Sequence, residues 1–263
     1  MTDKYIHGTH VDEQERLEKL NTLTNNAFKS FIEIPKTGSV LEIGSGIGLL
    51  AKELSVENPN VEFKGIEFSN DQLVKARALE TGRLKFIQGD AHHLPFDSDQ
   101  FDVCYGRYIL EHVHSPSVVL IEMHRVLKTG GTIFLQENNI FANVFFPTCP
   151  AFDKVWNQFA KLQEYLGGDA LIGKKLFSYL QEAGFSKIEL SVANEVHWYG
   201  SPMYETWIRN LIGNIKGAEE LMSQHGYSSI DEINRSVKEL EELIQNKSGS
   251  CYFYWNRARA IKV

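Results

Sequence analysis

Residues 42–48 read Glu42-Ile43-Gly44-Ser45-Gly46-Ile47-Gly48 and directly follow the short apolar run Val40-Leu41. A short apolar run that ends in several glycines is typical of a buried strand that turns sharply into a helix. Glycine has no Cβ, so the backbone can turn tightly there and a ligand can approach it closely. In an open α/β sheet, ligands bind at the carboxyl ends of the strands. This stretch therefore predicts a ligand site at a strand-to-helix turn.

Strands and helices alternate on both sides of this turn. The apolar patterns predict strands at 40–43, 61–66, 84–87, 101–105 and 132–136. They also predict a helix that follows the glycine turn and ends at about residue 56, a helix that begins after Ser69 as its N-cap, and a helix at 117–127. Parallel neighbouring strands need a crossover connection, which helices of this length supply. The first half of the chain therefore predicts a parallel, doubly wound sheet of the α/β class.

The second half is mainly helical but returns to strands. We expect helices at 152–166, 176–183 and within 201–245, and strands at 188–196 and 251–260. We interpret the chain as one domain because sheet-like segments return at its end. Its expected parts are a lid with an amphipathic helix (1–37), a core (38–137), a continuation with a helical cap (138–250) and a final strand (251–263).

Composition excludes several classes of protein. The 263 residues are 43% hydrophobic, which is enough to bury a core, and carry a net charge of −7, which argues against binding a phosphate backbone. No apolar run approaches the roughly 18–20 residues that span a bilayer, and the start lacks the apolar core of a signal peptide. Three cysteines without CxxC spacing indicate neither a disulfide framework nor a zinc site. We expect a soluble, cytoplasmic protein.

Three acidic residues lie where the sheet would hold a ligand. Glu67 ends the second strand, 23 positions after Gly44, where a carboxylate can accept both hydroxyls of a ribose. Asp90 follows the third strand and could accept from an adenine amino group. Glu42 would face the positive end of the ligand and would repel a phosphate. A pyrophosphate ligand is also disfavoured because Leu49 occupies the position of the third glycine of the dinucleotide fingerprint.

In this region the chain resembles the class I S-adenosylmethionine-dependent methyltransferases. It is most similar to the small-molecule branch that includes the ubiquinone/menaquinone biosynthesis type. The resemblance covers about residues 38–137 and rests on these motifs, in order: Glu42 to Gly48, Gly65-Ile66-Glu67, Gly89-Asp90-Ala91, Leu94-Pro95-Phe96, Phe101-Asp102-Val103, Leu110-Glu111-His112 and Arg125 to Gly131. It implies a Rossmann-like doubly wound sheet of seven strands, mostly parallel with an antiparallel last strand, plus a helical cap.

The same resemblance implies S-adenosyl-L-methionine as cofactor, with S-adenosyl-L-homocysteine as product, and assigns residues to it. Gly44, Ser45 and Gly46 would line the methionine part, near Glu42, and Glu67 would bind the ribose. Phe68 would flank the adenine, while Asp90 and Ala91 meet its edge. The backbone of Arg107 would touch the methionine amine. Because an N-terminal helix covers the cofactor in related enzymes, Tyr5 and Arg16 are further candidates, with helix packing and a solvated arginine as the competing interpretation.

Methyl transfer from a sulfonium is an in-line displacement, so alignment of the reacting atoms supplies most of the acceleration. A general base matters only if the acceptor is protonated at the working pH. Glu137, at the end of the fifth strand, is the first candidate and His112 the second, with His7 and His10 behind them; each has a structural alternative. No metal is expected, because the spacing of the remaining histidines matches no ligand pattern.

The acceptor is not identified by the sequence. Residues 138–263 hold 19 of the 30 aromatic residues, so we expect the acceptor pocket there and a small or medium-sized acceptor. We expect no nucleic-acid partner, no membrane insertion, and a monomer or homodimer. A catalytically silent, cofactor-binding regulatory protein is the alternative, and a nicotinamide-dependent oxidoreductase is less favoured because of Leu49.

Overall fold

The computed structural model describes residues 20–21 and 24–263. Tyr5, Arg16, His7 and His10 therefore lie outside the described residues. The described chain forms two compact units. We call residues 24–138, 172–193 and 256–263 the sheet unit, and residues 139–171 and 194–255, together with 20–21, the helical unit.

The sheet unit has the predicted mostly parallel sheet. Its strands are β1 (Gly38–Ile43), β2 (Val61–Glu67), β3 (Leu84–Gln88), β4 (Phe101–Arg107), β5 (Leu127–Glu137) and the end of β8 (Ser250–Ile261). They lie in the order β3-β2-β1-β4-β5-β8. Strands β1 to β5 are parallel to one another, and β8 is antiparallel to β5. This confirms the predicted doubly wound sheet with an antiparallel last strand.

Helices cover both faces of this sheet. They are α2 (Leu49–Glu57), α3 (Asn70–Arg77), α4 (Pro116–Val126) and α6 (Ile172–Glu182). Alternate residues of a strand point to opposite faces. In β1, Val40 accordingly packs in the core with α2 and α3, whereas Leu41 packs in the core with α4 and α6. This two-sided burial explains why consecutive residues of β1, from Val40 to Ile43, are all buried.

The fifth strand begins earlier than the sequence predicts. We expected a helix to residue 127 and a strand from residue 132, but β5 already starts at Leu127 and contains Gly130 at φ 82°. The amide of Gly130 donates to Lys262 O at 2.8 Å, and the amide of Lys262 donates to Gly131 O at 3.0 Å. Because these bonds come from the far end of the chain, no local pattern predicts them.

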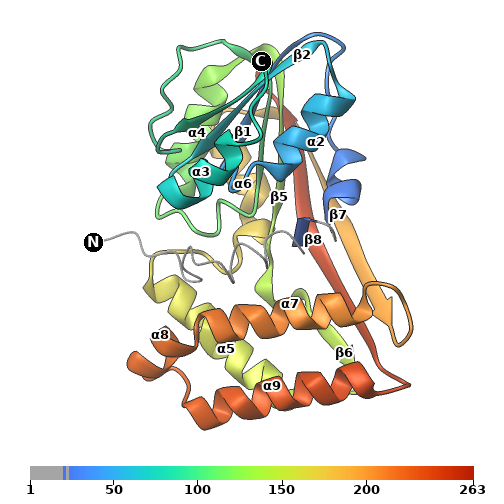
Figure 1. Cartoon of the computed structure of the whole chain (residues 1–263). Coiled ribbons are helices and arrows are strands. Elements are labelled where there is room, and N and C mark those ends of the chain that lie inside the picture. Colours follow the sequence, from blue (N-terminus) through green and yellow to red (C-terminus); the bar gives the residue numbers. More distant parts are fainter. Residues whose placement is uncertain (1–19, 22–23) are drawn as a thin grey trace. The chain divides into compact units, whose positions relative to one another are not determined.

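The helical unit consists of η1 (Ile140–Ala142), β6 (Val144–Phe146), α5 (Pro150–Tyr165), α7 (Tyr204–Gly217), α8 (Glu219–Gln224) and α9 (Ile230–Gln245), with parts of β7 (Ser186–Trp198) and β8. Helices α5 and α7 both pack against α9 (Figure 1). Ser229 begins α9 with a capping box, since its hydroxyl accepts from the amide of Glu232 and its own amide donates to the Glu232 carboxylate. The apolar stripe that predicted this helix is buried at Ile233, Leu240 and Ile244.

The described residues form eight strands rather than seven. The additional strand, β6, pairs antiparallel with β8, with Val144 opposite Tyr252. Three residues are too few to show a periodic pattern, so this strand exists only because β8 offers it a partner.

Cys104, Cys149 and Cys251 are buried free thiols. None of the helices in the described chain has the length and apolarity that crossing a bilayer requires.

Candidate functional site

The glycine-rich turn after β1 has a backbone that only glycine adopts easily. Gly44, Gly46 and Gly48 have φ angles of 67°, 55° and 80°, in the left-handed region. A Cβ on Gly44 would overlap the side chain of Ile109, and a Cβ on Gly48 would lie 2.6 Å from the ring of Phe86. Conformational freedom and close packing of Ile109 and Phe86 therefore both require glycine at these positions.

Glu67 ties this turn to the end of β2. One carboxylate oxygen accepts from the amide of Gly46 at 2.7 Å and the other from the amide of Ser69 at 2.8 Å. Burial raises the pKa of Glu67, and the amides of Ser69, Gly46 and Phe68 act against that rise. The carboxylate is thus fixed in orientation at the turn, and each oxygen keeps a lone pair for a further donor.

Glu42 is buried one strand away, opposite Tyr105 of β4 and Gly65 of β2 in the sheet. Its Oε2 atom has no hydrogen-bond partner in the described chain. Burial raises its pKa to about 8, while the charge of Arg107 and the neighbouring Tyr105 hydroxyl act in the opposite direction. The hydroxyl of Ser45, in the turn itself, is also buried without a partner. Buried polar atoms of this kind need an external donor or acceptor to satisfy them.

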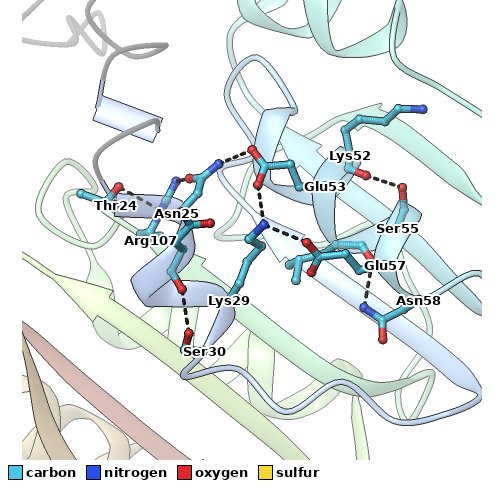
Figure 2. A network of polar contacts seen from close by, with 12 residues as sticks. Thr24, Asn25, Lys29, Ser30, Lys52, Glu53, Ser55, Glu57, Asn58 and Arg107 are labelled. Carbon is cyan, nitrogen blue, oxygen red and sulfur yellow. Dashed lines mark hydrogen bonds and ion pairs between the residues drawn. The ribbon is translucent and has the colours of Figure 1, made fainter.

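Arg107 lies at the end of β4, and its side chain points away from the sheet toward the helical residues 24–29. Its guanidinium donates to Thr24 Oγ1 at 3.1 Å and to Asn25 Oδ1 at 2.7 Å, and it lies over the ring of Phe28. Asn25 in turn donates to Glu53 of α2 at 2.8 Å (Figure 2). The Arg107 side chain therefore anchors the first helical residues of the sheet unit to the end of β4.

Asp90 and Phe68 lie at the ends of β3 and β2. Asp90 is exposed, and its Oδ1 accepts from the amide of His92 at 2.9 Å and lies 2.7 Å from the ring Nδ1 of His92. Partial burial would raise the pKa of Asp90, but these two contacts outweigh it and the pKa is lowered. The ring of Phe68 is 59% exposed, so it offers a free aromatic face, and Ala91 is buried beside Asp90.

Glu137 is fully buried at the end of β5. Its Oε1 accepts from the amides of Ile109 and Leu110, at 3.2 and 3.1 Å, and its Oε2 has no partner among the described residues. Burial, and next the charge of Glu111, raise its pKa to about 8. Glu137 therefore holds the turn after β4, the turn whose Ile109 side chain covers Gly44.

Sequence reasoning missed Glu111 as part of this region. Glu111 is 6% exposed; its Oε2 accepts from Asn138 at 3.2 Å, and its Oε1 lies 3.7 Å from His112 Nε2. An acidic residue between apolar Leu110 and His112 was the available signal, because a buried carboxylate needs partners. Among the described residues, no group of three or more His, Cys, Asp or Glu side chains is arranged to hold a metal.

The structure brings the predicted residues of the sheet unit to one edge of the sheet. Glu42, Gly44, Glu67 and Arg107 lie at the carboxyl ends of three adjacent strands, β1, β2 and β4. Glu137 is the last residue of the next strand, β5, and Asp90 follows β3. The arrangement can hold a ligand with hydroxyl donors, a flat ring and a positive charge.

The part of the chain that matches a known protein family lies in the sheet unit. Residues 41–135 match the family described as a methyltransferase domain. An uncharacterised methyltransferase of Schizosaccharomyces pombe is 22% identical over 84% of this chain and 82% of its own length. A ubiquinone/menaquinone biosynthesis C-methyltransferase of Geobacter sp. is 30% identical over 50% of this chain; the match spans only 56% of that relative.

Two solved structures share the fold over most of the chain. A structure of a Bacillus halodurans protein called a putative methyltransferase has a TM-score of 0.61 and 22% identity, over 91% of this chain and 98% of that one. A phosphoethanolamine N-methyltransferase of Haemonchus contortus, in complex with S-adenosyl-L-methionine, has a TM-score of 0.58 and 18% identity, over 90% of this chain and 52% of that one. At these identities the likeness concerns the fold.

Proposed function

Since residues 41–135 match a methyltransferase domain, we propose that the chain is a class I S-adenosylmethionine-dependent methyltransferase, which transfers the methyl group of S-adenosyl-L-methionine to a small or medium-sized acceptor. The observation that carries the proposal is the carboxylate of Glu67, fixed by the amides of Gly46 and Ser69 at the glycine turn. The unpartnered Oε2 of Glu42 lies at the end of the adjacent strand.

The residues present fit this cofactor. Glu67 has free lone pairs for two ribose hydroxyls, and the exposed ring of Phe68 offers a surface for adenine. The buried oxygen of Glu42 can accept from an ammonium, which would also favour its ionised form. A dinucleotide fits less well, because Leu49 stands where the dinucleotide fingerprint has its third glycine and a pyrophosphate at the turn would lie near the carboxyl group of Glu42. The predictions for Tyr5 and Arg16 lie outside the described residues and remain predictions.

S-adenosyl-L-methionine supplies a methyl group on a positively charged sulfur, which a lone pair of the acceptor attacks in line. The chain contributes mainly alignment. Glu137 supports this by fixing the backbone of Ile109 and Leu110, and its complete burial favours positioning over proton transfer. Where the acceptor must lose a proton, His112 beside Glu111 is the better placed of the two predicted bases.

A small-molecule acceptor is the finer part of the proposal. The Geobacter relative is named for quinone biosynthesis, and the Haemonchus enzyme is named for phosphoethanolamine, so relatives of this fold act on small molecules. The helical unit contributes aromatic side chains of the kind that line apolar pockets, including Trp156, Trp207 and Trp255.

Isothermal titration calorimetry tests the cofactor assignment. We expect S-adenosyl-L-methionine and S-adenosyl-L-homocysteine to bind and NAD not to bind. Glu67→Gln replaces an acceptor of two amides by a side chain with one NH2 group, so we expect the Kd for S-adenosyl-L-homocysteine to rise at least about tenfold. Glu62→Gln, on the exposed face of the same strand, is the matched control and should leave the Kd unchanged.

Binding of NAD in place of S-adenosyl-L-homocysteine would contradict the proposal. Transfer itself is measured with methyl-labelled S-adenosyl-L-methionine and a panel of small acceptors. Labelled product from any acceptor excludes the catalytically silent regulator, and tight binding without transfer to any of them favours it.

A further inference from the structure

The short sheet of the helical unit has one covered face and one open face. It consists of β6, residues 194–198 of β7 and residues 250–255 of β8. On one face, Phe253 and Trp255 of β8 are buried, and the ring of Trp207 of α7 lies 5.2 and 6.1 Å from their rings. On this face Glu195 and His197 of β7 are buried as well.

The opposite face is apolar and exposed, and we call it the outer sheet face. Because strand residues alternate between the two faces of a sheet, the residues of this face are those that alternate along each strand with the buried residues. Its large side chains, each between 37% and 62% exposed, are Val144, Phe146, Val196, Trp198, Tyr252 and Tyr254. The remaining outward positions, Asn194 and Ser250, are polar but uncharged. The outward side chains of these described strands therefore carry no charge.

The size of this face is that of an interaction surface. A soluble chain rarely leaves contiguous apolar area of several hundred Å² without a use for it. The four aromatic side chains, each about half exposed, offer on the order of 400 Å². Two copies meeting through this face would remove twice that area, and the valines and a rim bring the total toward the roughly 1,200 Å² at which specific interfaces begin.

We propose that two copies of this chain associate through the outer sheet face. Two faces without charge can meet with no like-charge repulsion and no buried unpaired ion, although each chain carries a net charge of −7. Flat sheet faces pack on one another as in a β-sandwich, and a two-fold axis makes one face its own partner. A lipid surface fits less well, because membrane-surface binding draws on basic residues at the rim of the apolar patch, and these outward positions supply none.

Sedimentation velocity of the full chain between about 1 and 100 µM tests this, since dimers with interfaces of this size form in that range. We expect a concentration-dependent dimer for the unaltered chain. Trp198→Lys and Tyr252→Lys, made separately on two strands, would bury two like charges at each interface and should raise the dimer Kd at least about tenfold. Val74→Lys, equally exposed on α3 in the sheet unit, is the matched control and should leave the Kd unchanged.

Far-UV circular dichroism and urea unfolding check that each variant folds. Because the two lysine variants lie on different strands, a folding defect in one leaves the other as a test. A chain that stays monomeric at 100 µM overturns the proposal, as does a dimer that both variants leave unchanged. A monomer that sediments with phosphatidylcholine vesicles also overturns it and assigns the face to lipid.

Discussion

Glu42 and Glu137 are the two carboxyl groups of the site whose burial raises the pKa to about 8. They lie at the carboxyl ends of β1 and β5, and each has one carboxyl oxygen without a hydrogen-bond partner in the described chain. A carboxyl group with so high a pKa is protonated near neutral pH and costs the folded state free energy when it ionises. Ligand binding and stability should therefore both depend on pH through these two residues.

Glu137→Gln gives the first test of this dependence. The pKa of Glu137 is about 8 in the folded chain and near its ordinary value of 4.5 when unfolded. The folded state thus binds the extra proton between pH 4.5 and 8, so the contribution of Glu137 to stability is greatest below pH 4.5 and is lost as the pH rises to 8. Glutamine resembles the protonated acid, still accepts from the amides of Ile109 and Leu110, and lacks this loss.

We expect the free energy of unfolding of Glu137→Gln, relative to the unaltered chain, to increase by on the order of 3 kcal/mol between pH 5 and pH 8. Urea unfolding at several pH values measures it. Glu62→Gln, at an exposed position of β2, is the control, and its unfolding free energy should vary with pH in parallel with that of the unaltered chain. Parallel curves for Glu137→Gln would show that Glu137 ionises normally in the folded state.

Among the elements, the turn between β1 and α2 is where backbone conformation and ligand site coincide. Gly44 needs both a positive φ and the absence of a Cβ, because Ile109 lies against it. Gly130 has a positive φ as well, but no atom lies within 4 Å of where its Cβ would be. The two positions separate the cost of strained φ from the cost of overlap.

Gly130→Ala should lower the free energy of unfolding by about 1–2 kcal/mol, the cost of a left-handed residue with a Cβ. Gly44→Ala should cost more, because Ile109 and the turn held by Glu137 must move. It should also raise the Kd for S-adenosyl-L-homocysteine at least about tenfold, while Gly130→Ala leaves it unchanged. Urea unfolding and calorimetry measure the two effects; equal behaviour of the two variants would show that the overlap at Gly44 is relieved without cost.

For the whole molecule, the three cysteines report on the two units separately. Cys104 belongs to the sheet unit, whereas Cys149 and Cys251 belong to the helical unit, and all three are buried. Burial, as the largest effect, raises the pKa of each thiol, so the folded chain should react slowly with thiol reagents. Each thiol becomes reactive only when its own unit opens.

S-adenosyl-L-homocysteine at about 100 times its Kd should therefore slow the labelling of Cys104 by up to roughly 100-fold. It should slow Cys149 and Cys251 less, because the proposed ligand contacts named above belong to the sheet unit. Mass spectrometry after timed exposure to iodoacetamide measures each site. Equal slowing at all three cysteines would show that the two units open together.

Local sequence patterns were sufficient to predict most of the helices and strands. The strands β1 to β4 are short segments rich in apolar residues, and α9 has apolar residues at helical spacing (Ile233, Leu240 and Ile244), so both kinds of element can be predicted from the sequence. The start of β5 and the strand β6 do not, because they exist through hydrogen bonds to Lys262 and Tyr252, which lie more than 100 residues away along the chain. Pairing with a distant strand overrides a local glycine signal because it satisfies the backbone groups directly.

The sequence by itself determined the glycine turn, the acids at the strand ends and their common edge, because strand order and period follow from local chemistry. Only the tertiary structure decided what each side chain touches. It put the Arg107 side chain on Asn25, buried Glu137 under two amides, and exposed one apolar face of β6, β7 and β8. These outcomes depend on burial and on partners distant in sequence, which a linear pattern does not contain.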